Sequence, residues 1–301
     1  MSDSMANRAW PAPAKLNLML RITGRRPDGY HTLQTVFQFL DHGDYLYFKV
    51  RDDEKIIRAT ELPGVATDQE LTIRAARLLQ RVSGTRLGAE ITLDKRLPLG
   101  GGLGGGSSDA ATTLVALNHL WQLGFSEDDL AALGLQLGAD VPVFVRGRAS
   151  WAEGIGEILT PVELPEPWYW VVIPDCQVST KEVFSDPELT RNSTPITMRD
   201  FTSGETRNDC VLVVRGRYPK VSEAMDWLGR GARLTGTGAC VYASFPTAEE
   251  ARVVRLPSGC QAFLARGRNR SPLVDCLRES TGVWPSGKAR DFDSRIPRFE
   301  S

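Results

Sequence analysis

A glycine run between residues 98 and 109 constrains this chain more than any other feature. It reads Pro-Leu-Gly-Gly-Gly-Leu-Gly-Gly-Gly-Ser-Ser-Asp. The alternating residues 89–94 before it predict a strand, and the apolar spacing after it predicts a helix. In such a loop the backbone N–H groups can approach a ligand closely, and a helix start adds unpaired N–H donors with a positive dipole end. The run therefore predicts a phosphate-binding loop.

Two familiar phosphate loops do not fit this run. A Walker A loop ends in Gly-Lys-Ser/Thr, whereas Gly106 is followed by Ser107 and the run contains no lysine. The His-Arg-Asp and Asp-Phe-Gly sequences of protein kinases are also missing. The dinucleotide pattern G-x-G-x-x-G is matched, but so glycine-dense a run matches it almost automatically. A flexible linker is the alternative, and the flanking strand and helix signals disfavour it.

Charge, cysteines and histidines argue against several classes of protein. A formal net charge of −1 gives no support to a nucleic-acid binder, and no apolar run is long enough to span a bilayer. The 5 cysteines form no C-x-x-C pair and the 3 histidines are scattered, which argues against a disulfide framework and a metal site. The N-terminus lacks the apolar core of a signal peptide. We expect a reduced, cytoplasmic protein without nucleic-acid or membrane partners.

The 301 residues are expected to form about two domains of α+β class. In the first half, strands are predicted at 16–22, 36–40, 45–50 and 89–94, helices over 71–82, from Ser107 or Ser108 to Gly124 and from Ser126 to Gly138, and a hairpin over 149–161. Residues 161–167, rich in proline and acids, indicate a linker.

The second half is predicted to have a different order of elements. Strands are expected at 168–173, near Leu234, at 240–245 and at 260–265, with helices over 221–228 and 248–254. This order is β-α-β-β-α-β, a split βαβ sandwich. The predicted domains are therefore residues 1–162 and 163–277. A tail over 278–301, rich in Arg, Ser and Pro, is expected to be mobile and disordered.

Five blocks of sequence together resemble one family of enzymes. They are Pro13–Leu18, Arg26–Leu33, Pro98–Ser108, Leu137–Phe144 and Leu234–Cys240. The third block resembles the ATP-binding loop of the GHMP kinases. Within that family, the blocks as a set are similar to the 4-diphosphocytidyl-2-C-methyl-D-erythritol kinases, from about Trp10 to Leu273. The resemblance implies a GHMP kinase fold, with an N-terminal ribosomal-protein-S5-domain-2-like domain and a C-terminal ferredoxin-like domain.

Lys15 and Asp140 are the candidate catalytic residues. Lys15 and Asn17 lie on the strand face opposite the leucines, and Asp140 stands where an element ends, just before Pro142. Taken alone, Lys15 fits a solvated lysine on a strand as well as it fits a catalytic residue. Asp140, taken alone, is more typical of a helix N-cap than of a catalytic residue. The resemblance implies that Asp140 is the general base for the attacking hydroxyl. It implies that Lys15 keeps that carboxylate ionised and stabilises the transferred phosphoryl group.

The resemblance also assigns residues to two substrates and a metal ion. Residues expected to hold the ATP phosphates are Pro98, Leu99, Gly100, Gly101, Gly102, Leu103, Gly104, Gly105, Gly106, Ser107 and Ser108, and Ser107 or Ser108 would reach Mg²⁺. Residues expected to contact a cytidine diphosphate-linked methylerythritol are Asn17, Tyr30, His31, Ile155, Thr180 and Phe184. Among these, Tyr30 and Phe184 would stack on the cytosine and His31 would read its edge. Glu70 stands where the family has an adenine-side asparagine, and Lys181 where it has a proline.

The implied activity is ATP-dependent phosphorylation of the 2-hydroxyl of 4-diphosphocytidyl-2-C-methyl-D-erythritol, a step of the non-mevalonate isoprenoid pathway. Another GHMP kinase is one alternative, and the Tyr30-His31 block argues against it because only a cytosine reader needs that block. A non-catalytic sensor that binds nucleotide is a second alternative. The presence of both Lys15 and Asp140 argues against it. We expect the protein to be a monomer or a weak homodimer.

Overall fold

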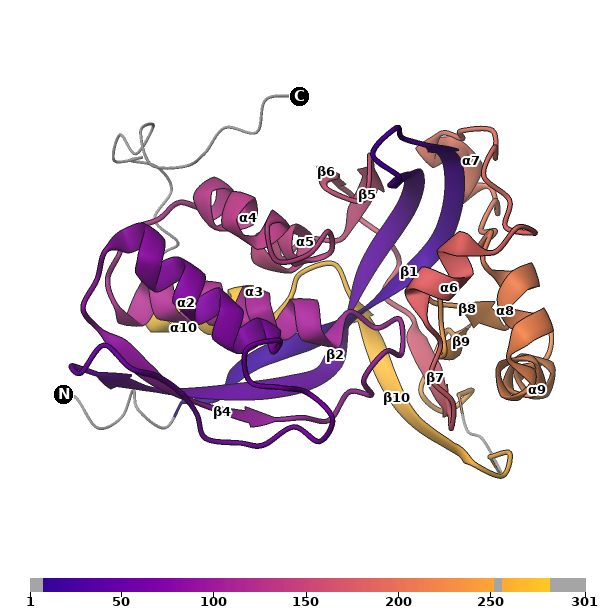
Figure 1. The fold of residues 1–301 in the computed structure, drawn as a ribbon. Helices are drawn as coiled ribbons and strands as arrows, with labels where there is room; N and C mark the ends of the chain where they lie inside the picture. The colour runs from indigo at the N-terminus through magenta and orange to yellow at the C-terminus, as the bar shows by residue number, and fades with distance from the viewer. Residues whose placement is uncertain (1–7, 252–255, 282–301) are drawn as a thin grey trace.

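The computed structural model describes residues 8–251 and 256–281, which form two lobes (Figure 1). The first lobe contains β1 (Trp10–Arg25), β2 (His31–Arg51), β3 (Ile56–Arg58), α2 (Leu71–Ser83), β4 (Gly88–Asp94), α3 (Gly105–Leu120), α4 (Glu127–Leu135), α5 (Val141–Arg146), β5 (Ser150–Glu153), β6 (Ile158–Pro161) and α10 (Pro272–Thr281). The second lobe contains β7 (Trp168–Pro174), α6 (Thr180–Ser185), α7 (Met198–Thr202), α8 (Val211–Arg217), α9 (Pro219–Leu228), β8 (Arg233–Leu234), β9 (Val241–Phe245) and β10 (Cys260–Arg268).

One sheet runs through both lobes. Its strand order is β3-β4-β2-β10-β7-β9-β8, and β1 and β5 also pair with β2. Strand β10 joins the halves because it pairs with β7 along most of its length and then with β2 at Gly267 and Arg268. Figure 1 shows β10 passing between the helices of the first lobe and those of the second. The α+β class expected from the sequence is confirmed.

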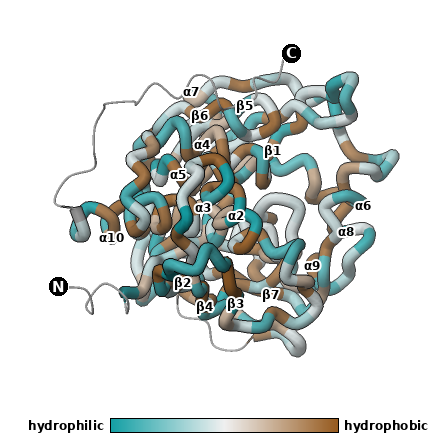
Figure 2. The backbone as a smooth tube through the Cα atoms, turned by 60° about the vertical axis from the view of Figure 1, so that its left-hand side comes forward, coloured by the Kyte–Doolittle hydropathy of each residue, from teal (hydrophilic) through white to brown (hydrophobic). Residues whose placement is uncertain are grey.

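Buried apolar side chains form three clusters. The first lies between the sheet of the first lobe and its helices, and it includes Phe39, Phe144 and Leu273. The second lies where β1 and β2 meet β7, β9 and β10, and the third fills the second lobe. In Figure 2 the hydrophobic stretches run through the middle of the molecule, along α3 and its neighbours. Helix α10 thus returns the chain to the first core after β10.

Several elements of the first lobe follow their local signals. The helix predicted over 71–82 is α2, the hairpin over 149–161 is β5–β6, and Ser126 caps α4 in a capping box with Asp129. The two strands predicted at 36–40 and 45–50 are instead the single strand β2. No turn separates them because Gly43 packs on β1, where a Cβ atom would lie 2.2 Å from the Ala12 carbonyl oxygen.

The second lobe differs more from its prediction. Residues 248–251 form a turn rather than the start of a helix, and 252–255 lie outside the described residues. The short helices α6, α7 and α8 were not predicted. At the C-terminus, α10 continues through Thr281, so residues 278–281 are helical where a disordered tail was predicted. Burial of Leu273 and Leu277 in the first core holds this helix in place. Residues 282–301 lie outside the described range, and the domain limits at 162 and 277 stay predictions.

Candidate active site

A cavity of about 720 Å³ lies between the two lobes. Its wall contains all eight predicted catalytic and substrate residues, namely Lys15, Asn17, Tyr30, His31, Asp140, Ile155, Thr180 and Phe184. The glycine run contributes Pro98, Leu99, Gly100, Gly101, Gly102, Gly104, Gly105, Gly106 and Ser107. The fold therefore brings together residues that are up to 169 positions apart in the chain.

Lys15 lies at the base of this cavity, although its side chain is only 4% exposed. Its Nζ lies 3.3 Å from Asp140 Oδ2 and donates hydrogen bonds to Asn17 Oδ1 at 2.5 Å and to the Gly102 carbonyl oxygen at 3.2 Å. The Asp140 side chain is 35% exposed and makes no side-chain cap to α5. Its carboxylate therefore faces the cavity beside a fixed positive charge, as a general base for a hydroxyl requires.

Asn17 connects this pair to the second lobe. Its amide nitrogen Nδ2 donates to Thr35 Oγ1 at 2.9 Å, and its backbone N–H donates to Thr235 Oγ1 at 3.0 Å. The Thr235 hydroxyl in turn donates to the Gly102 carbonyl oxygen at 3.1 Å. The segment after β8 thus packs against both the glycine run and Asn17, which is a hydrogen-bond partner of Lys15.

Two glycines in the run allow this close packing. At Gly102 a Cβ atom would lie 2.2 Å from the Thr235 carbonyl oxygen, and at Gly104 it would lie 2.8 Å from the Phe144 ring and 3.0 Å from Lys15 Cε. Both residues have positive φ, at +75° and +73°, which glycine adopts without strain. Gly104 is also the N-cap of α3. The helix start predicted at Ser107 or Ser108 is wrong because α3 begins before both, at Gly105.

A buried ion cluster lies behind the glycine run. Lys95 Nζ contacts Asp44 Oδ2 at 2.6 Å and Asp109 Oδ2 at 2.7 Å. Asp44 Oδ1 also accepts the backbone N–H groups of Arg96 and Leu97. Asp44 and Lys95 therefore tie the segment that enters the run to Asp109, the fifth residue of α3, which follows the run. Burial raises the pKa of Asp109 to about 7.

The far end of the cavity is aromatic. Tyr30 is 60% exposed, and the rings of His31 and Phe184 stack with centroids 5.1 Å apart at 28°. Arg191 Nε donates to His31 Nε2 at 3.2 Å. Partial burial, together with the charges of Arg191 and Arg25, lowers the pKa of His31.

Three residues considered in the sequence do not reach the cavity wall. Leu103 is buried in the core between the lobes, and Ser108 lies fully buried on the inner side of α3. Glu70 is buried at the start of α2, where it pairs with Arg58 at 3.0 Å and accepts a hydrogen bond from Thr72. The Glu70 carboxylate is therefore engaged inside the first lobe.

Sequence reasoning missed the residues that support the site from behind. Lys95, Asp44 and Asp109 have no shared motif, and Arg191 lies in a segment without periodicity. The one local signal was Asp109, an acid directly after two serines in the glycine run. None of the others could be found without their partners in space.

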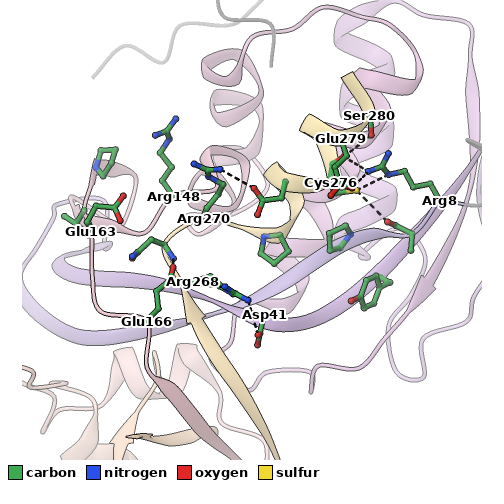
Figure 3. Close-up of a pocket in the computed structure, with 18 residues that line it drawn as sticks. Arg8, Asp41, Arg148, Glu163, Glu166, Arg268, Arg270, Cys276, Glu279 and Ser280 are labelled. Atoms are coloured by element: carbon green, nitrogen blue, oxygen red, sulfur yellow. Dashed lines mark hydrogen bonds and ion pairs between the residues drawn. The ribbon is translucent and has the colours of Figure 1, made fainter. Parts of the chain in front are cut away.

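A second, larger cavity of about 1330 Å³ contains none of the predicted site residues. Figure 3 shows arginines and acids together on its walls, from Arg8, just before β1, to Glu279 on α10. The ion pairs here have long N–O distances or exposed side chains, such as Arg268 with Asp41 at 3.6 Å and Arg270 with Asp275 at 3.5 Å. Because both signs of charge are mixed, this cavity does not resemble a site for a polyanion.

Within residues 8–251 and 256–281, no group of three metal-ligating side chains could hold an ion. No helix in the same ranges is both long and apolar enough to cross a membrane.

The fold and the glycine-lined cavity place this chain in the GHMP kinase class. Residues 70–148 match the family model described as the N-terminal domain of GHMP kinases. The fold is also similar to that of a mevalonate kinase from Methanococcus jannaschii, with a TM-score of 0.61 over 87% of this chain and 98% of that one, at 15% identity.

Nearer relatives narrow the family. The chain is 61% identical to a 4-diphosphocytidyl-2-C-methyl-D-erythritol kinase of Pseudomonas paraeruginosa over 267 residues, which cover 87% of this chain and 95% of the relative. It is 32% identical to a crystal structure of 4-(cytidine 5'-diphospho)-2C-methyl-D-erythritol kinase, with a TM-score of 0.72 over 86% of this chain and 99% of that one. The chain belongs to the 4-diphosphocytidyl-2-C-methyl-D-erythritol kinase family.

Proposed function

We propose that this chain transfers the terminal phosphoryl group of ATP to the 2-hydroxyl of 4-diphosphocytidyl-2-C-methyl-D-erythritol. The observation that carries the proposal is the contact between Lys15 and Asp140 at the wall of a glycine-lined cavity. A phosphoryl transfer needs a base for the hydroxyl, positive charge at the transferred group and a cradle for polyphosphate. The cavity contains all three within one space.

The glycine run suits the phosphates of ATP. The run lines the cavity from Gly100 to Gly106 with the single exception of Leu103, and the first residues of α3, Gly105 to Ser107, also line it. Cβ atoms at Gly102 and Gly104 would fill part of the room that the loop and Lys15 use. We therefore assign the run to the ATP half of the site.

A magnesium ion would be held mainly by the phosphates, since the described residues offer no ready set of ligands. Ser107 is the loop serine that lines the cavity, so its hydroxyl is the side-chain group placed to reach the ion. When bound, Mg²⁺ would neutralise phosphate charge during transfer.

The chain's own residues carry the remaining chemistry. Asp140 accepts the proton of the attacking hydroxyl, and Lys15 holds that carboxylate in place while its ammonium stabilises charge on the oxygen and the phosphoryl group. Asn17 and the Gly102 carbonyl orient the Lys15 ammonium. Tyr30, His31 and Phe184 form the aromatic end, which suits the cytidyl group that the names of the relatives carry.

The decisive experiment measures ADP release by the purified full chain. With ATP alone the rate should stay at background, and it should rise when 4-diphosphocytidyl-2-C-methyl-D-erythritol is added. Mevalonate and homoserine, the acceptors of other GHMP kinases, should give no rise. Turnover with one of these instead, or no turnover with any acceptor, would refute the proposed substrate. We also propose a cytoplasmic location and a monomer or weak homodimer, which subcellular fractionation and sedimentation would test.

A further inference from the structure

Arg191 holds a defined place beside the aromatic end of the cavity. It lies in the segment after α6, where Nη2 donates to the carbonyl oxygens of Phe184 and Asp186 at 3.0 and 2.6 Å, and Nη1 to that of Leu189 at 3.1 Å. These contacts aim Nε at His31 Nε2, which lies 3.2 Å away. A guanidinium has only donors, so the nitrogen that faces it must accept and carry no hydrogen.

This contact leaves one protonation state for His31. A charged imidazole has hydrogens on both nitrogens and could not accept from Arg191. Arg191 and Arg25, across the β1–β2 pair, are the charged groups that act on the ring, and both disfavour the imidazolium form. The neutral ring must therefore carry its hydrogen on Nδ1, which has no hydrogen-bond partner in the described part of the chain.

We propose that Arg191 is a positioning residue that fixes the His31 hydrogen at Nδ1 and thereby sets which pyrimidine the cavity accepts. That the ligand at this end of the cavity is a pyrimidine rests on the proposed function. A fixed Nδ1–H group can only donate a hydrogen bond, so it selects a base whose facing atom is a hydrogen-bond acceptor. Cytosine N3 is such an acceptor, whereas N3 of uracil carries a hydrogen. Without Arg191 the ring could shift its hydrogen to Nε2 and accept from uracil as well.

The same arginine also places the stacking surface. It binds the carbonyl oxygen of Phe184, whose ring stacks on His31. One side chain from the second lobe thus sets both the hydrogen-bonding pattern of His31 and the position of its aromatic neighbour. Arg191 acts through these residues.

The first test reads the tautomer directly. The chain has 3 histidines, so long-range ¹H–¹⁵N spectra of the labelled full chain contain only three imidazoles, and His31→Gln assigns one of them. In the unaltered chain, His31 should show a bare Nε2 and a protonated Nδ1 near neutral pH. Arg191→Met should move the hydrogen at least partly to Nε2 and raise the midpoint of the His31 titration. Arg215→Met, which removes a surface arginine of the same lobe paired with Asp226, should change neither.

A bare Nδ1 in the unaltered chain, or an unchanged His31 signal in Arg191→Met, would overturn the proposal. This measurement needs no substrate, so it remains decisive even if the cytidyl substrate proves wrong.

The second test separates recognition from folding. Arg191→Met should raise KM for the cytidyl substrate about tenfold, with KM for ATP changed less than about twofold. The preference for CDP over UDP as an inhibitor should narrow. In a His31→Gln background the same substitution should raise KM for the cytidyl substrate by clearly less than about tenfold, because only the effect through Phe184 remains. An undiminished effect in that background would show that Arg191 acts only by holding the segment after α6, and would refute its action through His31.

Discussion

Lys15 combines deep burial with a charge at the wall of the cavity. Its ammonium lies over the Phe37 ring, 5.3 Å from the centroid, and is held by Asn17, Gly102 and Asp140. A lysine fixed by three acceptors cannot swing out to water, so its charge stays where the phosphoryl group would pass. The burial of this residue is thus part of its chemistry.

Replacement of either member of this pair should abolish turnover without unfolding the chain. Asp140→Asn keeps the shape but cannot take a proton, and Lys15→Met keeps the buried stem but removes the charge. We expect each to lower kcat by about 10²–10⁴-fold in the ADP-release assay, with an unchanged circular dichroism spectrum. Asp128→Asn, at an 81% exposed side chain, is the matched control. Activity of either variant near that of the control would contradict the assignment.

Gly104 offers a second test at the scale of one residue. In Gly104→Ala the new Cβ atom would press on Phe144 and on Lys15 Cε, and we expect kcat/KM to fall about 10²-fold. Gly84→Ala has a similar φ of +67° but open space around its Cβ atom. That control should lose about 1 kcal/mol of stability in urea unfolding and keep its activity. Equal activity losses in both variants would show that backbone strain, rather than contact with Lys15, is responsible.

Sequence reasoning predicted the members of the site better than their surroundings. Lys15 and Asp140 could be found because short blocks around them carry a recognisable pattern. Their environment could not, since the solvated strand position that Lys15 suggests when taken alone is in fact buried. Arg191 gave no signal at all, because its role depends on His31, 160 residues away.

At the scale of elements, the ion cluster behind the glycine run makes stability depend on pH. Two carboxylates share one ammonium in a buried place, and the pKa of Asp109 rises to about 7. The folded chain therefore keeps a proton that the unfolded chain releases above about pH 4. The contribution of Asp109 to stability is fully present below about pH 4 and is lost as the pH rises from about 4 to about 7.

Asp109→Asn should remove this dependence. Its stability relative to the unaltered chain should improve between about pH 4 and pH 7, by up to about 1.4 kcal/mol per pH unit, and stay level above about pH 7, as measured by urea unfolding. Asp129→Asn would disturb the cap of α4 and is unsuitable as a control, whereas Asp128→Asn leaves the cluster intact. A difference between the Asp109→Asn variant and the unaltered chain that is constant over this range would contradict the assigned titration.

Elements with local signals were predicted well, and elements that depend on partners were not. Ser126 and Asp129 cap α4 within four residues, so the sequence pattern was sufficient. Strand β2 runs on through Gly43 only because β1 lies against it. Helices α6 and α7 have six and five residues, too few for a helical period to appear.

At the scale of the molecule, α10 makes the C-terminal segment part of the first lobe. Leu273 is 1% exposed in that core, and we expect Leu273→Ala to lower the free energy of unfolding by about 2–5 kcal/mol. Leu212→Ala, at a residue 70% exposed on α8, should change stability by less than about 0.5 kcal/mol. Urea unfolding of both variants measures the contrast. A loss in Leu273→Ala no larger than in this control would mean that α10 does not stabilise the first lobe.

The strand β10 has a mechanical consequence. It is hydrogen-bonded to β7 in one lobe and to β2 in the other, and the chain then continues directly into α10. Opening the lobes like a clamshell would break sheet hydrogen bonds and pull buried leucines into water. We therefore expect reactants and products to exchange through the rim of the cavity, at exposed Tyr30 and the turn at Gly236, with little change in the angle between the lobes.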